Sequence, residues 1–452
     1  MIQIQFLGAA DAVTGSRHLV TMGDQRILLD CGLFQGYKVL RERNWVPLAV
    51  PPQDIDAVVL SHAHLDHCGW LPRLVKSGFK GPVYASAATR DLAEVMLLDS
   101  AHLQEEDARR ANRYGYSQHA KAEPLYTQRD AQRAIARIVP LRPSQQQAIG
   151  AVKLDLSPAG HLLGANAVNL RHGSSSLVFS GDLGRNHDLL MPAPKPPPPA
   201  DVLLVESTYG NRRHPPEDVQ AALAGIVRST IARGGTVLLP SFAVGRAQAL
   251  LLVLQRLKAA GEIPPLLPIY LDSPMAIAAT ALYSQHRRLL RVPQREMATL
   301  ADGVKMLTTA TMSQQLTRTH YPCVIISASG MATGGRVLHH LKSLAPEPRN
   351  SVVFAGFQVG GTRGAHLVAG AREVKIHGQM VPVRAEIHQL EGFSGHADAD
   401  ELMAWLGQLH TPPQQTFVVH GEPDAADSLR LRIKTQLGWQ VRVPQHGERV
   451  QF

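Results

Sequence analysis

Short apolar runs that end in polar residues or glycine recur along roughly the first two hundred residues of the chain. Three of them span residues 2–10, 26–32 and 57–64. Runs of this length are typical of β-strands that deliver side chains to the edge of a sheet. Residues 69–78 and 92–115 instead carry patterns that favour helices. A further strand, at 175–184, carries an acidic residue just past its end, so this part of the chain is predicted to be α/β.

From about Asn211 the pattern changes to a regular recurrence of strand, loop and helix. It covers residues 235–261, 268–286, 323–345 and 351–370, and each segment begins with a nearly continuous apolar run. Parallel strands that helices cover on both faces require such runs. We therefore expect a separate doubly wound α/β domain in this region.

Around Glu373 the chain returns to short strands, and these continue to the final segment, residues 441–452. They resemble the first part of the chain more than the middle. The simplest organisation is one domain interrupted by an inserted domain. A chain of 452 residues is also too long for a single compact core.

Composition narrows the class of partner without identifying it. The formal net charge is +9, a balance that favours a polyanionic partner such as nucleic acid or a membrane surface. No apolar run approaches the length of a membrane span, and the N-terminus lacks the features of a signal peptide. The three widely spaced cysteines imply no disulfide framework, so we expect a reducing, cytoplasmic location.

The stretch SHAHLDHCG, residues 61–69, concentrates three histidines and an aspartate within six positions. If the preceding strand runs on past Ser61, then His62, His64 and Asp66 point to one side, and His67 can join them where the chain turns. Imidazoles and a carboxylate held in this way match the ligand preferences of zinc. The alternative is a set of surface residues without a joint role, but a chance match to this spacing is rare.

Three further residues stand at strand ends beside glycine, where additional ligands are needed. His161 lies between glycines beyond a short strand, Asp182 follows a strand and a glycine, and His420 ends a strand before a predicted helix. Taken singly, each is explained as a solvated loop residue. Their shared placement predicts that they complete a metal site.

The run H-x-H-x-D-H at residues 62–67 resembles the signature of the metallo-β-lactamase fold. The motifs ESTYG at Glu206, GHAD at His396 and VVHGE at His420 resemble the additional motifs of its β-CASP branch of nucleic-acid-processing nucleases. The likeness is to bacterial and archaeal relatives of the cleavage and polyadenylation endonuclease subunit. It implies a metallo-β-lactamase αβ/βα sandwich with an inserted doubly wound α/β β-CASP domain, divided as residues 1–209, 210–375 and 376–452.

The resemblance also implies two Zn²⁺ per chain and a role for each motif residue. His62, His64 and His161 would bind one ion, Asp66, His67 and His420 the other, and Asp182 would bridge them. Asp30 would orient a ligand histidine from behind, as carboxylates commonly do. Two such metals can clamp a phosphodiester during in-line attack by water, giving a 5′-phosphate and a 3′-hydroxyl.

The resemblance pairs His396 with Glu206, and this pair is the predicted source of the proton for the leaving oxygen. Glu206 would hold the imidazole in the required tautomer and raise its pKa. Asp398 is expected to cap a helix or support the site rather than serve as the acid. The alternative is that Glu206 and His396 are ordinary turn and helix-start residues.

Two glycine-rich turns in the inserted domain, at residues 327–335 and 358–364, suit phosphate oxygens, although tight turns required by packing explain them equally. The predicted substrate contacts in or beside such turns are Arg246, Ser329, Gly330, Arg336 and Arg363. The expected substrate is single-stranded RNA, because the RNA-processing members carry a histidine where His420 stands here.

Several alternatives stay open. A DNA nuclease, a 5′-exonuclease and a small-molecule hydrolase on the same fold share the metal motif, and inactive paralogues on this fold serve as binding scaffolds. The presence of all seven predicted ligands and of the His396–Glu206 pair favours an enzyme, and endonucleolytic cleavage in RNA processing or decay is the leading expectation. A homodimer is an open alternative to a monomer.

Overall fold

The computed structural model describes residues 1–452 except 116–119, 143, 217 and 319–320. These residues form two compact units, Met1–Arg213 with His396–Phe452, here called the sandwich unit, and His214–Gly395, the inserted unit. The inserted unit extends past the expected boundary at residue 375. It does so because strand β19 (Glu386–Leu390) pairs in parallel with β16 (Ser351–Ala355).

The sandwich unit contains two seven-stranded mixed sheets. The first has the order β22 (Arg449–Gln451), β1 (Ile2–Gly8), β2 (Arg17–Met22), β3 (Gln25–Leu29), β4 (Ala57–Val59), β5 (Val83–Ser86), β6 (Ile138–Leu141). The second has the order β21 (Val441–Arg442), β20 (Gln415–Val419), β11 (Val202–Glu206), β10 (Ser175–Phe179), β9 (Asn166–His172), β8 (Val152–Pro158), β7 (Gln147–Ile149).

One hydrophobic core joins the two sheets face to face. Ile4 and Leu29 from the first sheet belong to the same buried cluster as Val168, Leu204 and Phe417 from the second. Because alternate strand residues point inward, each sheet supplies one apolar face to this layer. The packing confirms the predicted sandwich of two sheets.

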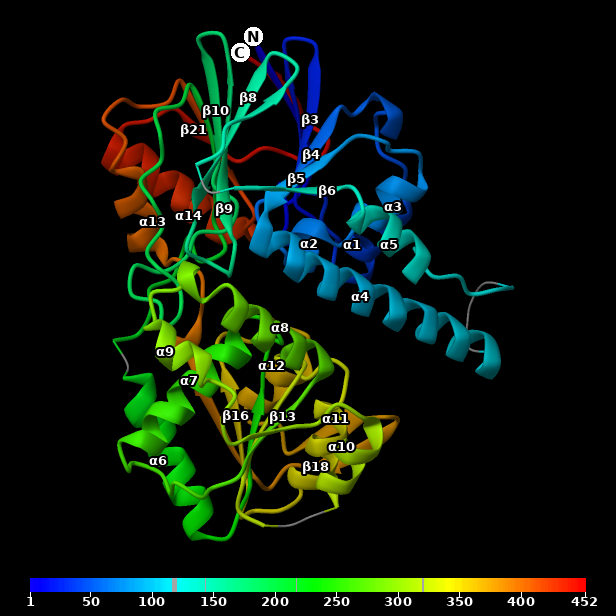
Figure 1. The fold of residues 1–452 in the computed structure, drawn as a ribbon, viewed down its shortest axis with the longest axis vertical. Coiled ribbons are helices and arrows are strands. Elements are labelled where there is room, and N and C mark those ends of the chain that lie inside the picture. Colours follow the sequence, from blue (N-terminus) through cyan, green and yellow to red (C-terminus); the bar gives the residue numbers. More distant parts are fainter. Residues whose placement is uncertain (116–119, 143, 217, 319–320) are drawn as a thin grey trace. The chain divides into compact units, whose positions relative to one another are not determined.

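Helices cover the outer faces of the sandwich (Figure 1). They are α1 (Lys38–Glu42), α2 (Leu65–Cys68), α3 (Leu71–Lys76), α4 (Ala87–Tyr114) and α5 (Gln128–Ile135) on one side, and α13 (Ala399–Leu406) and α14 (Pro423–Arg432) on the other. The longest, α4, begins at Ser86, whose hydroxyl accepts a hydrogen bond from the Thr89 amide, and ends at Gly115 in the left-handed conformation. These are the ordinary start and stop of a helix.

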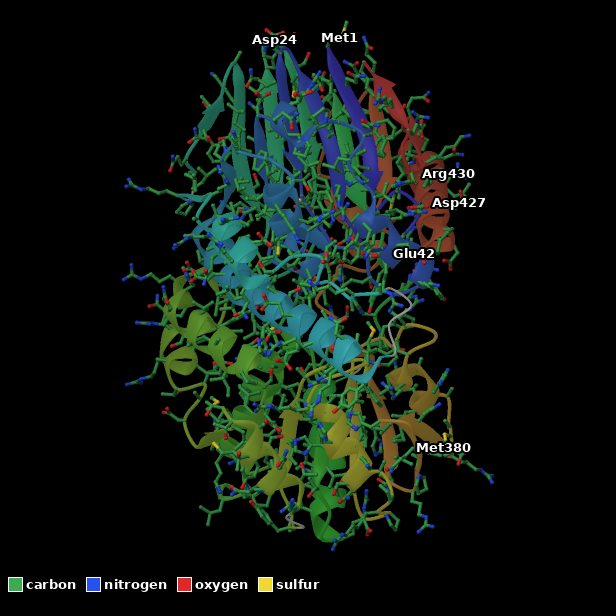
Figure 2. All side chains as sticks on the ribbon, turned by 90° about the vertical axis from the view of Figure 1, so that its right-hand side faces the viewer. Met1, Asp24, Glu42, Met380, Asp427 and Arg430 are labelled. Carbon is green, nitrogen blue, oxygen red and sulfur yellow. The ribbon has the colours of Figure 1, made fainter. Side chains whose placement is uncertain are left out.

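The two ends of the strands differ in chemistry. Ile2 pairs with Met22, so Met1 and the turn at Asp24 lie together at one end of the first sheet (Figure 2). At the opposite end, the parallel strands β3 and β4 run into Asp30 and Ser61. In the second sheet, β10, β11 and β20 are also parallel. Parallel strands bring the residues after their carboxyl ends to one edge, which positions a site there.

The inserted unit is built on a six-stranded sheet whose strand pairs are all parallel. The order is β14 (Val304–Met306), β13 (Ile269–Asp272), β15 (Val324–Ser327), β12 (Val237–Pro240), β16, β19, and a hairpin of β17 (Glu373–Ile376) and β18 (Gln379–Pro382) adjoins it in sequence. Its helices are α6 (Val219–Ala232), α7 (Arg246–Ala259), α8 (Pro274–Gln285), α9 (Gln294–Ala298), α10 (Ala310–Thr317), α11 (Val337–Leu344) and α12 (Arg363–Val368). This is the predicted α/β insertion.

Two smaller sequence expectations concern membranes and thiols. Among the residues that the structure describes, no helix is both long and apolar enough to cross a bilayer. The three cysteines, Cys31, Cys68 and Cys323, are buried free thiols. Burial raises the pKa of Cys31 to about 12 and of Cys323 to about 11, so these thiols stay protonated at neutral pH.

Candidate metal centre

The histidine-rich segment does not continue strand β4 as expected. The strand ends at Val59, His64 stands immediately before helix α2, and Asp66 and His67 belong to that one-turn helix. The alternation argument for His62, His64 and Asp66 was therefore wrong. A loop followed by a helical turn, rather than an extended strand, brings these side chains together.

Backbone hydrogen bonds from the loop after β3 and from the residue before β2 hold this turn in place. The amide of Cys31 donates to the carbonyl of His67 at 2.7 Å, and the amide of Ser16 donates to that of Asp66 at 2.8 Å. Gly32 lies so close to the turn that a Cβ there would stand 1.6 Å from the Asp66 carbonyl oxygen. Only glycine permits this approach, so the sequence Asp30–Cys31–Gly32 fixes the backbone beneath two of the predicted ligands.

The first group of predicted ligands consists of His62, His64, His161 and Asp182, whose donor atoms all lie within 4.8 Å of one another. Nε2 of His62 is 3.1 Å from Nδ1 of His64, and Nε2 of His161 is 3.2 Å from the same atom. The Oδ2 atom of Asp182 faces both His62 and His161, at 3.5 and 3.7 Å. The structure thus brings together residues from three separate segments.

The second group consists of Asp66, His67 and His420. Nε2 of His420 lies 3.6 Å from Oδ2 of Asp66. The other oxygen of Asp182, Oδ1, lies 3.3 Å from Nε2 of His67 and 3.5 Å from Nδ1 of His420. Asp182 therefore directs one oxygen toward each group, which is the arrangement a bridging carboxylate needs.

Asp30 lies behind the second group, as the resemblance implied. It is fully buried, and its Oδ2 is 2.7 Å from Nδ1 of His67. The carboxylate also accepts hydrogen bonds from the hydroxyl of Ser16 at 3.0 Å and from the amide of Ser61 at 2.8 Å. A carboxylate on the far nitrogen of a histidine fixes the ring orientation and leaves Nε2 directed at the site.

Local electrostatics keep most of these groups in the protonation state that metal ligands need. Burial, together with the neighbouring His67, holds the pKa of His62 well below its usual value, and burial lowers that of His64 to about 4. Burial alone would raise the pKa of Asp66, but His67 and His420 lower it to about 2. For His67 the carboxylates of Asp182, Asp30 and Asp66 outweigh burial and raise the pKa.

Three buried atoms of the site lack a hydrogen-bond partner among the described residues. They are Nε2 of His67, Oδ1 of Asp182 and Nε2 of His420. Buried polar atoms are nearly always paired. Nε2 of His67 faces Oδ1 of Asp182 at 3.3 Å, and Nε2 of His420 faces Oδ2 of Asp66 at 3.6 Å, at the second donor group. A divalent cation satisfies all of them at once, so the donor set fits the metal centre that the motifs predict.

His396 lies beside the donor groups with Glu206 behind it. Nδ1 of His396 is 3.5 Å from Oε1 of Glu206, and the side chain of His396 is 22% exposed whereas that of Glu206 is fully buried. The amides of Leu183 and Thr208 donate to Glu206 at 2.6 and 3.1 Å. Although burial lowers the pKa of His396, the Glu206 carboxylate more than reverses that and raises it. Asp398 caps helix α13 through the amides of Asp400 and Glu401, as expected.

The predicted substrate residues all belong to the inserted unit, and three of its arginines already have partners there. The guanidinium of Arg336 donates to Asp272 at 2.8 Å and to the Leu307 carbonyl. The guanidinium of Arg363 donates to the carbonyls of Lys375 and Ala332. The guanidinium of Arg246 donates to the Ala355 carbonyl. The hydroxyl of Ser329 lies 3.0 Å from that of Thr333, and Gly330 packs against Phe242. These contacts account for local structure, and an RNA-binding role for the five stays a prediction.

Sequence reasoning missed two residues close to the centre. His18, on β2, is fully buried, and neither ring nitrogen has a hydrogen-bond partner among the described residues. Tyr209 lies against His396, with ring centroids 5.8 Å apart. An imidazole at an inward-facing strand position was a detectable signal for His18, whereas Tyr209 was visible only as part of the ESTYG motif.

Comparison with protein families gives three matches that follow one another along the chain. The model of the Metallo-beta-lactamase superfamily matches residues 15–224, and that of the Beta-Casp domain matches residues 247–367. The model described as the Zn-dependent metallo-hydrolase RNA specificity domain matches residues 380–444. These matches confirm the prediction that the chain has a metallo-β-lactamase fold with a β-CASP insertion.

Two similar proteins illustrate the range of relatives. The Ribonuclease TTHA0252 of Thermus thermophilus is 39% identical, over 98% of this chain and 98% of its own length. The Transcription termination factor FttA of Methanocaldococcus jannaschii is 33% identical, over 96% of this chain and 70% of its own length. A solved structure of a protein of unknown function from Enterococcus faecalis aligns over 99% of both chains with a TM-score of 0.56 at 13% identity, a likeness of fold alone.

Proposed function

This chain belongs to the metallo-β-lactamase superfamily and carries its Beta-Casp domain, and from that premise we propose that it is a zinc-dependent endoribonuclease. The observation that carries the proposal is the pair of donor groups on either side of Asp182, with the His396–Glu206 pair beside them. A small-molecule hydrolase on the same fold would account for the donor groups but not for the His396–Glu206 pair.

The residues of the site would act as two groups of metal ligands and one proton donor. His62, His64 and His161 would hold one zinc ion, and Asp66, His67 and His420 would hold a second, with one oxygen of Asp182 toward each. Zinc bound there supplies a water that ionises near neutral pH and positive charge for the phosphate oxygens. Asp30 and Ser61 keep the His67 ring in place throughout.

His396 would donate the proton that the leaving 3′-oxygen needs. Its Nδ1 faces Glu206, so Nε2 carries the proton toward the substrate. Two backbone amides donate to Glu206 and hold its side chain in place, and Glu206 would stabilise the charged imidazole. A water oxygen bonds to phosphorus as the O3′–P bond breaks, the proton from His396 goes to O3′, and the products are a 3′-hydroxyl and a 5′-phosphate.

RNA is the proposed substrate for two reasons. One similar protein is named a ribonuclease, and the family model over residues 380–444 is described as an RNA specificity domain. A net charge of +9 suits a polyanion that is held along its length. DNA hydrolysis and exonucleolytic trimming from a 5′ end are the competing outcomes of the test below.

The test uses the full chain loaded with zinc and three substrates of the same sequence: a single-stranded RNA labelled at either end, its covalently closed circle, and the corresponding DNA. We expect the circle to be linearised and the products to carry 5′-phosphates. A small ester, assayed separately, should not be turned over. A circle that stays intact while the linear RNA is degraded would exclude endonucleolytic action. Cleavage of DNA at the same rate would exclude specificity for RNA.

A further inference from the structure

Tyr209 stands next to the proposed proton donor, and Arg212 stands next to Tyr209. Neither residue belongs to a donor group. The Tyr209 ring is inclined by only 30° to that of His396, with 5.8 Å between centroids. The guanidinium carbon of Arg212 lies over the same phenol ring, 5.9 Å from its centroid. The Tyr209 side chain is half-buried, and Arg212 is exposed. An aromatic ring and a guanidinium are thus presented together beside the reacting position.

The turn that carries these two side chains is fixed to its neighbours within the sandwich unit. The Arg212 amide donates to the Tyr209 carbonyl at 3.1 Å, and the Ala399 amide at the start of α13 donates to the Arg212 carbonyl at 2.9 Å. Gly210 packs so tightly on α14 that a Cβ would stand 2.4 Å from the Ala425 carbonyl oxygen. The turn that presents Tyr209 and Arg212 is therefore ordered before a ligand binds, which lowers the entropic cost of binding.

The position of the leaving oxygen determines which nucleotide of the substrate would lie next to Tyr209 and Arg212. His396 gives its proton to the 3′-oxygen, which belongs to the nucleotide on the 5′ side of the cleaved bond. That nucleotide must therefore lie next to His396, within reach of the side chains that border the imidazole. Base stacking on an aromatic ring is how single-stranded RNA is held without reading its sequence, and arginine suits the adjoining phosphate.

We propose that Tyr209 and Arg212 form the subsite for the nucleotide that departs with the 3′-hydroxyl, Tyr209 stacking its base and Arg212 contacting the phosphate 5′ of it. The inference rests on the proposed ribonuclease function and adds a substrate-binding role for two residues outside the metal donors. The sandwich unit would then bind the product strand that ends in the 3′-hydroxyl.

The chain supplies a matched control for the arginine. Arg213 follows directly and is also exposed, and its Nε is 2.7 Å from a carboxylate oxygen of Asp400, whereas the guanidinium of Arg212 lies over the Tyr209 ring. Arg212→Ala and Arg213→Ala remove the same charge from neighbouring positions. For the ring, Tyr209→Phe keeps the stacking surface and Tyr209→Ala removes it.

The experiment measures kcat/KM on a short single-stranded RNA with one mapped cut, and on the same RNA with an abasic ribose either just 5′ or just 3′ of that cut. Losing the 5′ base should lower the rate of the native enzyme by about tenfold. It should have little effect on Tyr209→Ala, which already lacks the stack. Tyr209→Phe should match the native enzyme, and an abasic ribose on the 3′ side should affect all of them equally.

Arg212 is tested by salt dependence and by binding. Arg212→Ala should reduce the slope of log kcat/KM against log salt by about 0.7, the value for one phosphate on a single strand. Arg213→Ala should leave the slope unchanged. Anisotropy of a fluorescent RNA with zinc-free protein gives a second readout that needs no turnover, and there Arg212→Ala should bind more weakly than Arg213→Ala. Zinc content should stay native in every variant.

The outcomes separate the subsite from the function. Suppose that the native enzyme cleaves the RNA, but that the abasic ribose 5′ of the cut lowers kcat/KM equally in the native enzyme and in Tyr209→Ala. The proposed subsite is then wrong, while the proposed ribonuclease function is retained. Equal losses in Tyr209→Phe and Tyr209→Ala, or equal effects of the two arginine variants, also overturn the proposed subsite. If the native protein neither cleaves nor binds the RNA, both the proposed function and the subsite fail.

Discussion

Each unit of the protein buries an aspartate against at least one histidine, and the two clusters differ in whether their polar atoms have hydrogen-bond partners. In the inserted unit, Asp272 accepts hydrogen bonds from the hydroxyl of Ser313 at 2.5 Å and from Arg336 at 2.8 Å, and lies 2.6 Å from Nε2 of His340. In the sandwich unit, Asp182 keeps a buried oxygen without a hydrogen-bond partner among the described residues.

That difference separates a structural network from a binding site. A buried carboxylate whose oxygens are all used stabilises the protein as it stands. A buried carboxylate facing unpaired imidazoles carries a cost that only a further ligand removes. Residue types alone do not distinguish the two cases, because both clusters combine aspartate with histidine. The comparison also predicts which substitution damages chemistry and which damages stability.

The largest effect is expected for Asp182→Asn. The change keeps the shape of the side chain but removes the charge that both donor groups share. We expect zinc content to fall at both sites and RNA cleavage to drop by about 10⁴-fold or more, as measured by elemental analysis and single-turnover kinetics. A variant that keeps native zinc content and rate would contradict the bridging role.

The second effect concerns the proton donor. If His396 donates a proton, as proposed, and does not bind metal, His396→Gln should lower the cleavage rate by about 10²- to 10⁴-fold while zinc content stays native. His410→Gln is the matched control, since His410 is exposed in the same unit. Loss of zinc together with activity in His396→Gln would instead make this residue a metal ligand.

The third effect concerns the hydrogen-bonded cluster around Asp272 in the inserted unit. Asp272→Asn breaks a buried, hydrogen-bonded charge network and should lower the free energy of unfolding by about 3 kcal/mol, measured by urea denaturation. Zinc content and the cleavage rate per folded molecule should not change. The exposed Asp302, changed to asparagine, serves as the control and should shift stability by less than about 0.5 kcal/mol. Zinc loss in Asp272→Asn would erase the distinction between the clusters.

The fold and the donor set were predictable because they depend on local pattern and ordered motifs. Continuous apolar runs in the middle of the chain predicted the parallel sheet of the inserted unit, which the structure has. The family of the chain followed from motifs whose order is preserved from Asp30 to His420. The grouping of His62 with His64, and of Asp66 with His67, came from the resemblance, since β4 ends too early for strand alternation to produce it.

Contacts set by tertiary packing were not predictable. Nothing in the spacing of Asp272, Ser313 and His340 indicated a shared hydrogen-bond network. For the same reason Arg336 and Arg363, which glycine-rich turns suggested as phosphate contacts, have guanidinium groups bound to carbonyls of their own unit. A side chain's partner depends on which strands become neighbours, and that information is not local.

The smallest predicted effect concerns His18, whose ring nitrogens also lack partners among the described residues, although no donor group includes it. Its ring packs edge-on against Phe6 and Phe179, at 5.6 and 5.4 Å between centroids. Burial lowers the pKa of His18 from 6.5 to about 3, with a smaller contribution from His420 and His67. Between these pH values the unfolded chain binds a proton that the folded chain excludes, so stability falls as the pH decreases.

His18→Phe removes this titration while keeping an aromatic ring in the pocket. Between pH 7 and pH 5, the zinc-free native protein should lose about 2 kcal/mol more unfolding free energy than the variant, because 1.5 pH units below 6.5 correspond to that amount. Urea denaturation at the two pH values measures the difference, and comparing each protein with itself cancels any change in packing. Equal losses in both proteins would mean that His18 is protonated in the folded state and has a partner. Isolation among aromatic rings, as opposed to convergence with other donors, is therefore what makes an unpaired imidazole a neutral core residue rather than a ligand.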